Sequence, residues 1–180
     1  MKKLSRLGWM IALMLLTLKT FKAQEVGPKI ISSAFLTFSP NHLIKEKENN
    51  FYLHGQLNVF SGQRISFAGD VFYDLGSTHS NPTFSSQHQL LFGLNYHWRK
   101  SINDIYTGIQ PGFGVYSMND LTQKGNQIIP ILAFNGGYRI YISSHFHFFL
   151  EGHFVTGQSI SKNIHSVSSL RFSAGLGLQL

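Results

Sequence analysis

The sequence predicts an all-β fold, an eight-stranded antiparallel up-and-down barrel that spans a membrane, and three observations support this prediction. Apolar and polar residues alternate over many segments, charged residues make up only 13% of the 180 residues, and the segments are joined by connections of alternating length. Side chains of a strand alternate between its faces, so each segment has one apolar and one mainly polar face. A soluble domain usually carries about a quarter of charged residues, so the low charge favours a chain with little surface in water.

The clearest alternation lies between residues 51 and 75. Apolar residues and glycine occupy every second position from Phe51 to Val59, and the pattern resumes at Ile65 after a break at 61–63. Two strands separated by so short a break predict a hairpin. Each arm has about 11 residues, which is the length that a tilted strand needs to cross the hydrocarbon core of a bilayer.

The same alternation predicts eight strands, at residues 30–38, 51–60, 64–75, 90–99, 105–116, 128–141, 146–155 and 170–180. Three connections are short, at 61–63, 100–104 and 143–144, whereas four are long and polar, at 39–50, 76–88, 117–127 and 157–169. The long connections all fall at one end, as in outer-membrane barrels with short periplasmic turns and long extracellular loops. Pro111 cannot donate a ladder hydrogen bond, so we expect a bulge or a local break in its strand.

The first 24 residues have the features of a secretory signal peptide, so the barrel domain is expected at 25–180. Lys2, Lys3 and Arg6 form a basic start, and the apolar segment 8–18 is too short to cross a bilayer as a helix. The formal charge of the chain is +7, but five basic residues lie in this leader, which leaves 10 Lys and Arg against 8 Asp and Glu, a net charge of +2. Nucleic acid is therefore not an expected partner. Because Cys is absent, disulfides, thiolate metal sites and a cysteine nucleophile are excluded.

A soluble lipocalin-like barrel that holds a ligand is the alternative fold, because its strands would alternate in the same way. Side-chain volume favours the membrane barrel, since an eight-stranded barrel has room for only a modest core or one small ligand. The midplane of the lipid-facing band is then predicted at Leu57, Phe67, Leu94, Ile109, Phe134 and Leu150. An Arg at Leu94 should be costly, and we expect an Arg at the neighbouring lumen position, Asn95, to be tolerated better.

Four short motifs follow one another in the second half of the chain: Gly112-Phe113-Gly114, Gly136-Gly137-Tyr138-Arg139, Phe149-Leu150-Glu151 and Ser173-Ala174-Gly175-Leu176-Gly177-Leu178. In this order they resemble the outer-membrane-protein beta-barrel domain family of Gram-negative bacteria, which includes the small OmpA-like and OmpX-like barrels. The resemblance covers the whole mature chain and implies a monomer in the cell outer membrane, in contact with its lipids and lipopolysaccharide. It also implies insertion by the outer-membrane assembly machinery, although the chain ends in Leu180, where such barrels usually end in an aromatic residue.

The polar face of the strands holds any chemistry of the interior. Charged groups in a narrow, poorly hydrated lumen must pair or bind something, so we expect a plug of salt bridges and hydrogen bonds. Its predicted members are Arg64, Asp70, Asp74, Arg99, Arg139, Glu151 and Arg171. A narrow pore through the same lumen is the alternative.

No cofactor and no metal are expected. His145, His147, Glu151 and His153 are residues of types that bind zinc. On a strand, however, His147 and His153 would lie roughly 20 Å apart at ~3.3 Å per residue, which is too far for one ion. Interior hydrogen bonding is therefore the preferred interpretation of these histidines.

A lipid-modifying outer-membrane enzyme, of the deacylase or acyltransferase type, is the rival function. Glu151, His153 and Ser173 on adjacent strands could act as acid, base and nucleophile. These three residues face a polar lumen, however. An enzyme that acts on lipids needs either a nucleophile that faces the bilayer or an apolar lumen that holds the acyl chain. The preferred interpretation is therefore no enzyme, but a small barrel with a structural or surface-interaction role and an extracellular ligand at its loops.

Overall fold

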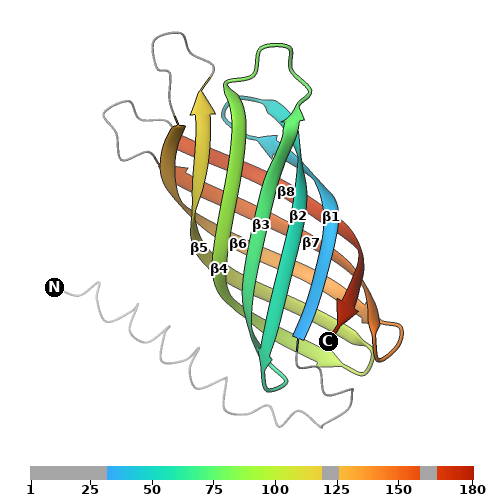
Figure 1. The fold of residues 1–180 in the computed structure, drawn as a ribbon. Helices are drawn as coiled ribbons and strands as arrows, with labels where there is room; N and C mark the ends of the chain where they lie inside the picture. The colour runs from blue at the N-terminus through green and yellow to red at the C-terminus, as the bar shows by residue number, and fades with distance from the viewer. Residues whose placement is uncertain (1–31, 119–125, 159–165) are drawn as a thin grey trace, which may run out of the picture.

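The computed structural model describes residues 32–118, 126–158 and 166–180, which form eight antiparallel strands. The strands are β1 (Ser32–Leu43), β2 (Glu48–Ser61), β3 (Ile65–Ser77), β4 (Phe84–Lys100), β5 (Asn103–Met118), β6 (Asn126–Tyr141), β7 (Phe146–Gln158) and β8 (Ser166–Gln179). Each strand pairs with its neighbours in the chain, and β1 pairs with β8, so the sheet closes into a barrel (Figure 1). The predicted fold class is thus confirmed. The predicted signal peptide at 1–24 lies outside the described residues.

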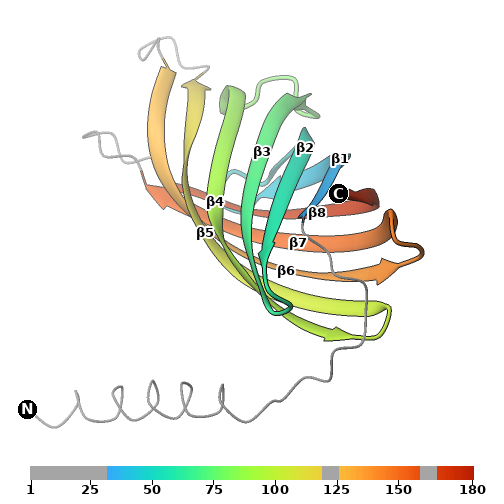
Figure 2. The same ribbon diagram turned by 60° about the horizontal axis from the view of Figure 1, so that its bottom comes forward.

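The connections separate into two groups at the two ends of the barrel. Figure 2 shows the barrel with its lower end turned forward, and the short connections 62–64, 101–102 and 142–145 belong to this end. The connections 44–47 and 78–83 belong to the opposite end, which is the outer end in the predicted orientation. No helix within the described ranges is long and apolar enough to cross a membrane.

The outer wall of the barrel is apolar, and the inner wall carries the polar face of every strand. The six predicted midplane residues all point outward, with between 46% and 58% of their surface exposed. Asn95, the neighbour of Leu94, is only 1% exposed. Exposed aromatic residues lie toward both ends of the wall, at Trp98, Tyr138, Phe146 and Phe148 below and at Phe51, Tyr73 and Phe154 above. A soluble barrel would have its apolar face inside, so this arrangement supports the membrane barrel and its aromatic girdles.

The strands extend further toward the outer end than the sequence predicted, and the connections there are shorter. β1 continues to Leu43 and β2 begins at Glu48, so four residues replace the expected loop 39–50. The expected loop 76–88 shortens in the same way to 78–83. In both places polar residues face the lumen rather than water. Asn41 Nδ2, for example, donates to Asn50 Oδ1 at 2.6 Å, and both side chains are buried.

The strands that flank the other two expected loops also extend further than predicted. β5 runs to Met118 and β6 begins at Asn126, whereas a loop was expected at 117–127. β7 runs to Gln158 and β8 begins at Ser166, whereas a loop was expected at 157–169. The middle of each connection, 119–125 and 159–165, lies outside the described residues.

Pro111 produces the local break that the sequence predicted. The β4–β5 ladder pairs Leu91 with Gly112 and resumes with Leu94 and Ile109, so the pairs in between are missing while the register is unchanged. The β5–β6 ladder runs through Pro111 without interruption. A proline has no N–H to donate, so one side of its strand loses the ladder and the other keeps it.

The lumen around Asn95 is full, which corrects one expectation. Asn95 Nδ2 donates to Asn58 Oδ1 at 3.1 Å, and Asn95 Oδ1 accepts a hydrogen bond from Asn135 Nδ2 at 3.0 Å. Gly108 must be a glycine here, because a Cβ at this position would overlap Asn95 Oδ1. An Arg at Asn95 therefore has no room and would not be the tolerated variant.

We predict that Leu94→Arg lowers the free energy of unfolding in lipid vesicles by about 2 to 4 kcal/mol, because it places a charge at the midplane of the bilayer. Ile105→Arg is the matched control. It lies on the paired strand near the connection 101–102, is also on the outer wall, and should cost only about 0 to 1 kcal/mol. Urea unfolding of both variants in vesicles measures the difference. Costs of at most about 0.5 kcal/mol for both, as for a surface in water, would contradict a lipid-facing wall.

Candidate functional site

The interior of the barrel is filled by three layers of side chains, which we call lower, central and upper from the periplasmic to the outer end. The lower layer consists of His97, Arg99, Asp104 and Tyr141. The central layer consists of His54, Gln56, Asp70, Tyr106, Gln110, Asn135, Arg139, Glu151 and His153. The upper layer consists of Arg171 with its partners and an apolar cluster.

Two carboxylates lie in the central layer, and one amide joins them. Asp70 on β3 and Glu151 on β7 are 0% and 1% exposed. Gln56 Nε2 on β2 donates to Asp70 Oδ1 at 2.8 Å and lies 3.1 Å from each oxygen of Glu151. A buried charge is costly unless it is hydrogen-bonded, so this shared amide stabilises two buried acids at once.

Asp70 has donors on both of its oxygens. His54 Nε2 lies 2.8 Å from Oδ1, and Gln110 Nε2 lies 2.5 Å from Oδ2. These donors come from β2 and β5, whereas the acid comes from β3. The acid therefore ties together strands on two sides of the barrel.

Glu151 is held in the same way by its own set of donors. Tyr106 OH donates to Oε2 at 2.9 Å, and Asn135 Nδ2 donates to Oε1 at 3.0 Å. His153 Nε2 also lies 3.0 Å from Oε1, an ion-pair distance, but it is not aligned for a hydrogen bond. The described part of the lumen thus gives each oxygen of both acids at least one donor.

Arg139 is completely buried and reaches the acids only through the amide. Its Nη2 donates to Gln56 Oε1 at 2.8 Å, and its Nη1 donates to Ser33 Oγ at 3.3 Å. The guanidinium carbon lies 4.4 Å from the ring centroid of Tyr106. Stacking on an aromatic ring stabilises a desolvated cation, so Arg139 is held by an amide and a ring in place of a carboxylate.

The lower layer is built around Asp104, which the sequence analysis placed in a turn at 100–104. In the structure β4 continues to Lys100 and β5 begins at Asn103, so Asp104 points into the lumen and is 0% exposed. Its Oδ2 lies 2.9 Å from His97 Nδ1, 2.9 Å from Tyr141 OH and 3.5 Å from Arg99 Nη2. The missed acid is therefore the partner of the predicted plug residue Arg99.

Arg171 is the buried cation of the upper layer, and neutral groups surround it. Its Nε donates to Asn41 Oδ1 at 3.0 Å, and its Nη2 donates to Gln89 Oε1 at 2.6 Å. The rings of Tyr52 and Phe72 lie 4.7 and 4.4 Å from the guanidinium carbon. The apolar cluster beside it consists of Leu43, Tyr52, Phe72, Phe84, Leu91, Tyr116, Ile129, Ile131, Ala133, Val155 and Val167. The outer part of the interior is thus more apolar than the sequence analysis expected.

The remaining predicted plug residues lie at the ends of the barrel. Arg64 is half-buried in the connection 62–64. Asp74 is half-buried near the outer end, where its Oδ2 accepts a hydrogen bond from the backbone N–H of Gln87 at 2.9 Å and its Oδ1 one from Gly76 at 3.1 Å. Arg99 forms an ion pair with Asp104, and the carboxylates of Asp70, Asp104 and Glu151 each face a histidine. The lumen therefore relies on hydrogen bonds more than on salt bridges.

Ser173 lies at the end of a chain of polar groups that differs from the expected catalytic trio. Its Oγ is 2.8 Å from His54 Nδ1, and the other nitrogen of His54 faces Asp70. The Ser173 hydroxyl donates to Ser39 Oγ at 3.0 Å, and Ser39 Oγ donates to the carbonyl of Phe172 at 2.9 Å. Ser173 is only 1% exposed, and its hydroxyl proton is donated to Ser39. This arrangement therefore does not present a serine nucleophile to a lipid.

The histidines at 145, 147 and 153 do not form one group. His145 is exposed in the connection 142–145, whereas His147 is buried in the lumen. His153 lies in the central layer, 5.4 Å from His54 between ring centroids. His54 comes from β2, and the sequence gave no reason to pair it with His153, because the two residues are far apart in the chain.

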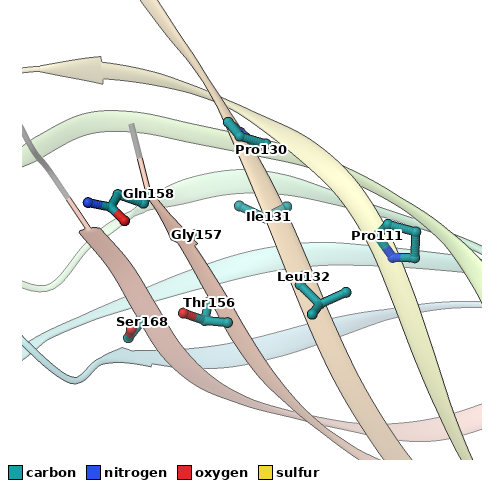
Figure 3. A pocket seen from close by; sticks show the side chains of 8 residues that line it. All are labelled: Pro111, Pro130, Ile131, Leu132, Thr156, Gly157, Gln158 and Ser168. Carbon is teal, nitrogen blue, oxygen red and sulfur yellow. The ribbon is translucent and has the colours of Figure 1, made fainter. Parts of the chain in front are cut away.

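A groove of about 480 Å³ lies on the outer wall where β6 and β7 diverge. The β6–β7 ladder ends at Ile131 and Gly157, while β6 continues upward through Pro130. Figure 3 shows Pro130, Ile131 and Leu132 of β6 beside Thr156 to Gln158 of β7, with Pro111 of β5 and Ser168 of β8 at the sides. Ile131 also belongs to the apolar cluster, and no lining residue of the groove belongs to the central layer.

Solved structures of small outer-membrane barrels have the same fold as this chain. Neisserial surface protein A aligns with a TM-score of 0.66 at 14% identity, over 83% of this chain and 96% of that one. OprG from Pseudomonas aeruginosa aligns with a TM-score of 0.58 at 11% identity, over 86% and 98%. Ail of Yersinia pestis, in a complex with the heparin analogue sucrose octasulfate, aligns with a TM-score of 0.57 at 13% identity, over 83% and 97%.

No protein-family model and no curated protein sequence matches the chain. The fold comparison and the apolar outer wall nevertheless agree with each other. They confirm the predicted fold, an eight-stranded β-barrel like those of small outer-membrane proteins.

Proposed function

We propose that this protein is a closed scaffold in the outer membrane that acts through its outer end, in a structural or surface-interaction role. The observation that carries this proposal is the filled lumen. From the half-buried Arg99 through the buried Gln56 and Arg171, side chains cross the interior at each level. Because a small barrel packed in this way leaves no wide passage, the outer end is the surface that remains for a partner.

The described part of the outer end is a fixed surface rather than a pair of separate hairpins. Glu48, at the start of β2, accepts hydrogen bonds from the backbone N–H of Thr83 at 3.0 Å and from Thr83 Oγ1 at 2.6 Å. The backbone N–H of Thr78 donates to the carbonyl of Asn49 at 3.0 Å. Both ends of the connection 78–83 are therefore fastened to the start of β2.

The exposed side chains of this surface favour a ligand with many hydrogen-bonding groups. The connection 78–83 exposes Thr78, His79, Ser80 and Asn81, and 44–47 carries Lys45, Glu46 and Lys47 with both signs of charge. The complex of Ail with a heparin analogue shows that a barrel of this fold can bind a glycan mimic. We infer that a polar extracellular ligand such as a glycan binds here. The membrane lipids and lipopolysaccharide surround the monomeric barrel, and the outer-membrane assembly machinery inserts it.

The filled lumen predicts that the purified protein shows little steady conductance in planar bilayers. A large porin with a water-filled channel, reconstituted in the same bilayer, is the positive control. Large, uniform open channels formed by the protein would show that the interior side chains move aside and that the narrow-pore alternative is correct.

The proposed role of the outer end can be tested by exchanging connections. We predict that replacing 78–83 by a two-residue Asn-Gly turn abolishes attachment of bacteria that display the barrel to a glycan array, because the polar surface is removed. The matched control replaces the periplasmic connection 142–145 in the same way and should leave attachment unchanged. Equal attachment by both variants, or none by the unchanged protein, would contradict a surface-interaction role.

A further inference from the structure

The central layer brings together residues that can bind a metal ion. His54 on β2, Asp70 on β3 and His153 on β7 each offer one ligand atom, and these three atoms lie within 4.8 Å of one another. The three residues are 0% to 1% exposed. Glu151 lies beside this group, with its Oε1 3.0 Å from His153 Nε2, although it is not within 4.8 Å of all three ligand atoms.

The ring nitrogens of His153 indicate that this cluster binds a ligand. Neither of its ring nitrogens has a hydrogen-bond partner, although the residue is buried. Buried polar side chains are normally hydrogen-bonded, and an exception calls for an explanation such as an ion. Its Nε2 points toward the carboxylate of Glu151 without the alignment of a hydrogen bond, as expected for two ligands of one cation.

The groups around this cluster hold the ligands in place. His54 Nδ1 lies 2.8 Å from Ser173 Oγ, which orients the ring so that Nε2 faces Asp70. The His54 ring stacks on Phe72 with centroids 4.0 Å apart, and His153 meets the edge of the same Phe72 ring at 5.4 Å. Metal-binding histidines commonly have such a partner on the second nitrogen, which fixes the ring and its tautomer.

We propose that His54 Nε2, His153 Nε2, Asp70 Oδ1 and Glu151 Oε1 bind one divalent cation of the zinc class. Two imidazoles and two carboxylates form a four-ligand set of the type that zinc accepts, at bond lengths of about 2.0 to 2.2 Å. In a tetrahedron with such bonds, ligand atoms lie about 3.3 to 3.6 Å apart. The N–O separations of 2.8 Å for His54 with Asp70 and 3.0 Å for His153 with Glu151 would widen by a fraction of an ångström. The carboxylate of Glu151 would also move closer to His54 and Asp70, because it lies outside the group of three.

The charge and the protons of the site also balance. The ion replaces the proton that His54 Nε2 shares with Asp70, and this proton leaves to the solvent as the ion binds. The two positive charges of the ion neutralise the two carboxylates, whose ion pairs within the described residues are with histidines. All four positions are filled by protein, so the site is structural rather than catalytic. It binds its ion while the barrel folds, because the closed lumen surrounds it afterwards.

This inference replaces the expectation of no metal. That expectation rested on His145, His147, Glu151 and His153 along one strand, where the distance from His147 to His153 rules out a shared ion. The structure instead supplies the second imidazole from β2, across the lumen.

The test uses the untagged chain, unfolded in urea and refolded into vesicles in the presence of Zn²⁺, then passed through a desalting column with EDTA. Mass spectrometry of the metal content should find about one zinc per folded chain. His153→Asn should reduce this at least tenfold, because the site loses a ligand. His147→Asn is the matched control: it removes an equally buried imidazole outside the cluster and should leave the zinc content unchanged. The shift in mobility on an unheated gel reports folding of each variant.

A second measurement keeps the test independent of the variants. Wild-type protein refolded with Co²⁺ should show the visible absorption bands of tetrahedral cobalt with nitrogen and oxygen ligands. The inference is overturned if folded wild-type protein carries no more zinc than folded His153→Asn protein. It is equally overturned if the cobalt-refolded wild type shows no tetrahedral bands.

Discussion

Polar groups inside a membrane barrel have no bulk water to bind, so they need hydrogen-bond partners within the protein. This requirement is strictest for the charged carboxylates of Asp70 and Glu151. Both are buried, and Gln56 donates to both while its carbonyl oxygen accepts from Arg139. One amide on β2 therefore links two acids and a cation that come from three other strands. These contacts require that β2, β3, β6 and β7 keep their register, because a slip of one residue would turn every side chain to the other face.

The backbone is subject to the same constraint where β1 meets β8. The ladder pairs residues 33–35 and 41–43 of β1 with β8 but is interrupted in between, next to Pro40, which has no N–H. Two side chains bridge the interruption: Thr37 Oγ1 donates to the carbonyl of Ala174 at 2.7 Å, and Ser39 Oγ donates to that of Phe172 at 2.9 Å. In hydrocarbon each backbone polar group needs a partner within the protein, so these hydroxyls complete the closure of the barrel.

The alternation of residues was sufficient to predict the number of strands and the faces of the strands from residue 51 onward, because side-chain direction in a strand depends only on position. The alternation was insufficient to predict where the strands end. Polar residues such as Asn41 and Asn50 fit a loop as well as the lumen, and only the pairing with a neighbouring strand shows which of these places they occupy. Asp104 was missed for the same reason. The partners within the lumen were also beyond the sequence: His54 and Ser173 are separated by 119 residues, and their contact depends on how the barrel closes. Neutral amides such as Gln56 carry no charge that would have marked them as central.

In this barrel, lipid meets one face of each strand, and the other face is sealed from both lipid and water. Because the chain has no Cys, single-Cys variants at residues 91–98 of β4 can be labelled without background. The decisive measurement is the accessibility of each thiol in vesicles to a water-soluble reagent and of each attached fluorophore to a quencher in the lipid. We expect strong lipid quenching at positions 92, 94, 96 and 98 and little access of either reagent at 91, 95 and 97. Access of the water-soluble reagent to 92 and 94, or lipid quenching at 95 and 97, would contradict it.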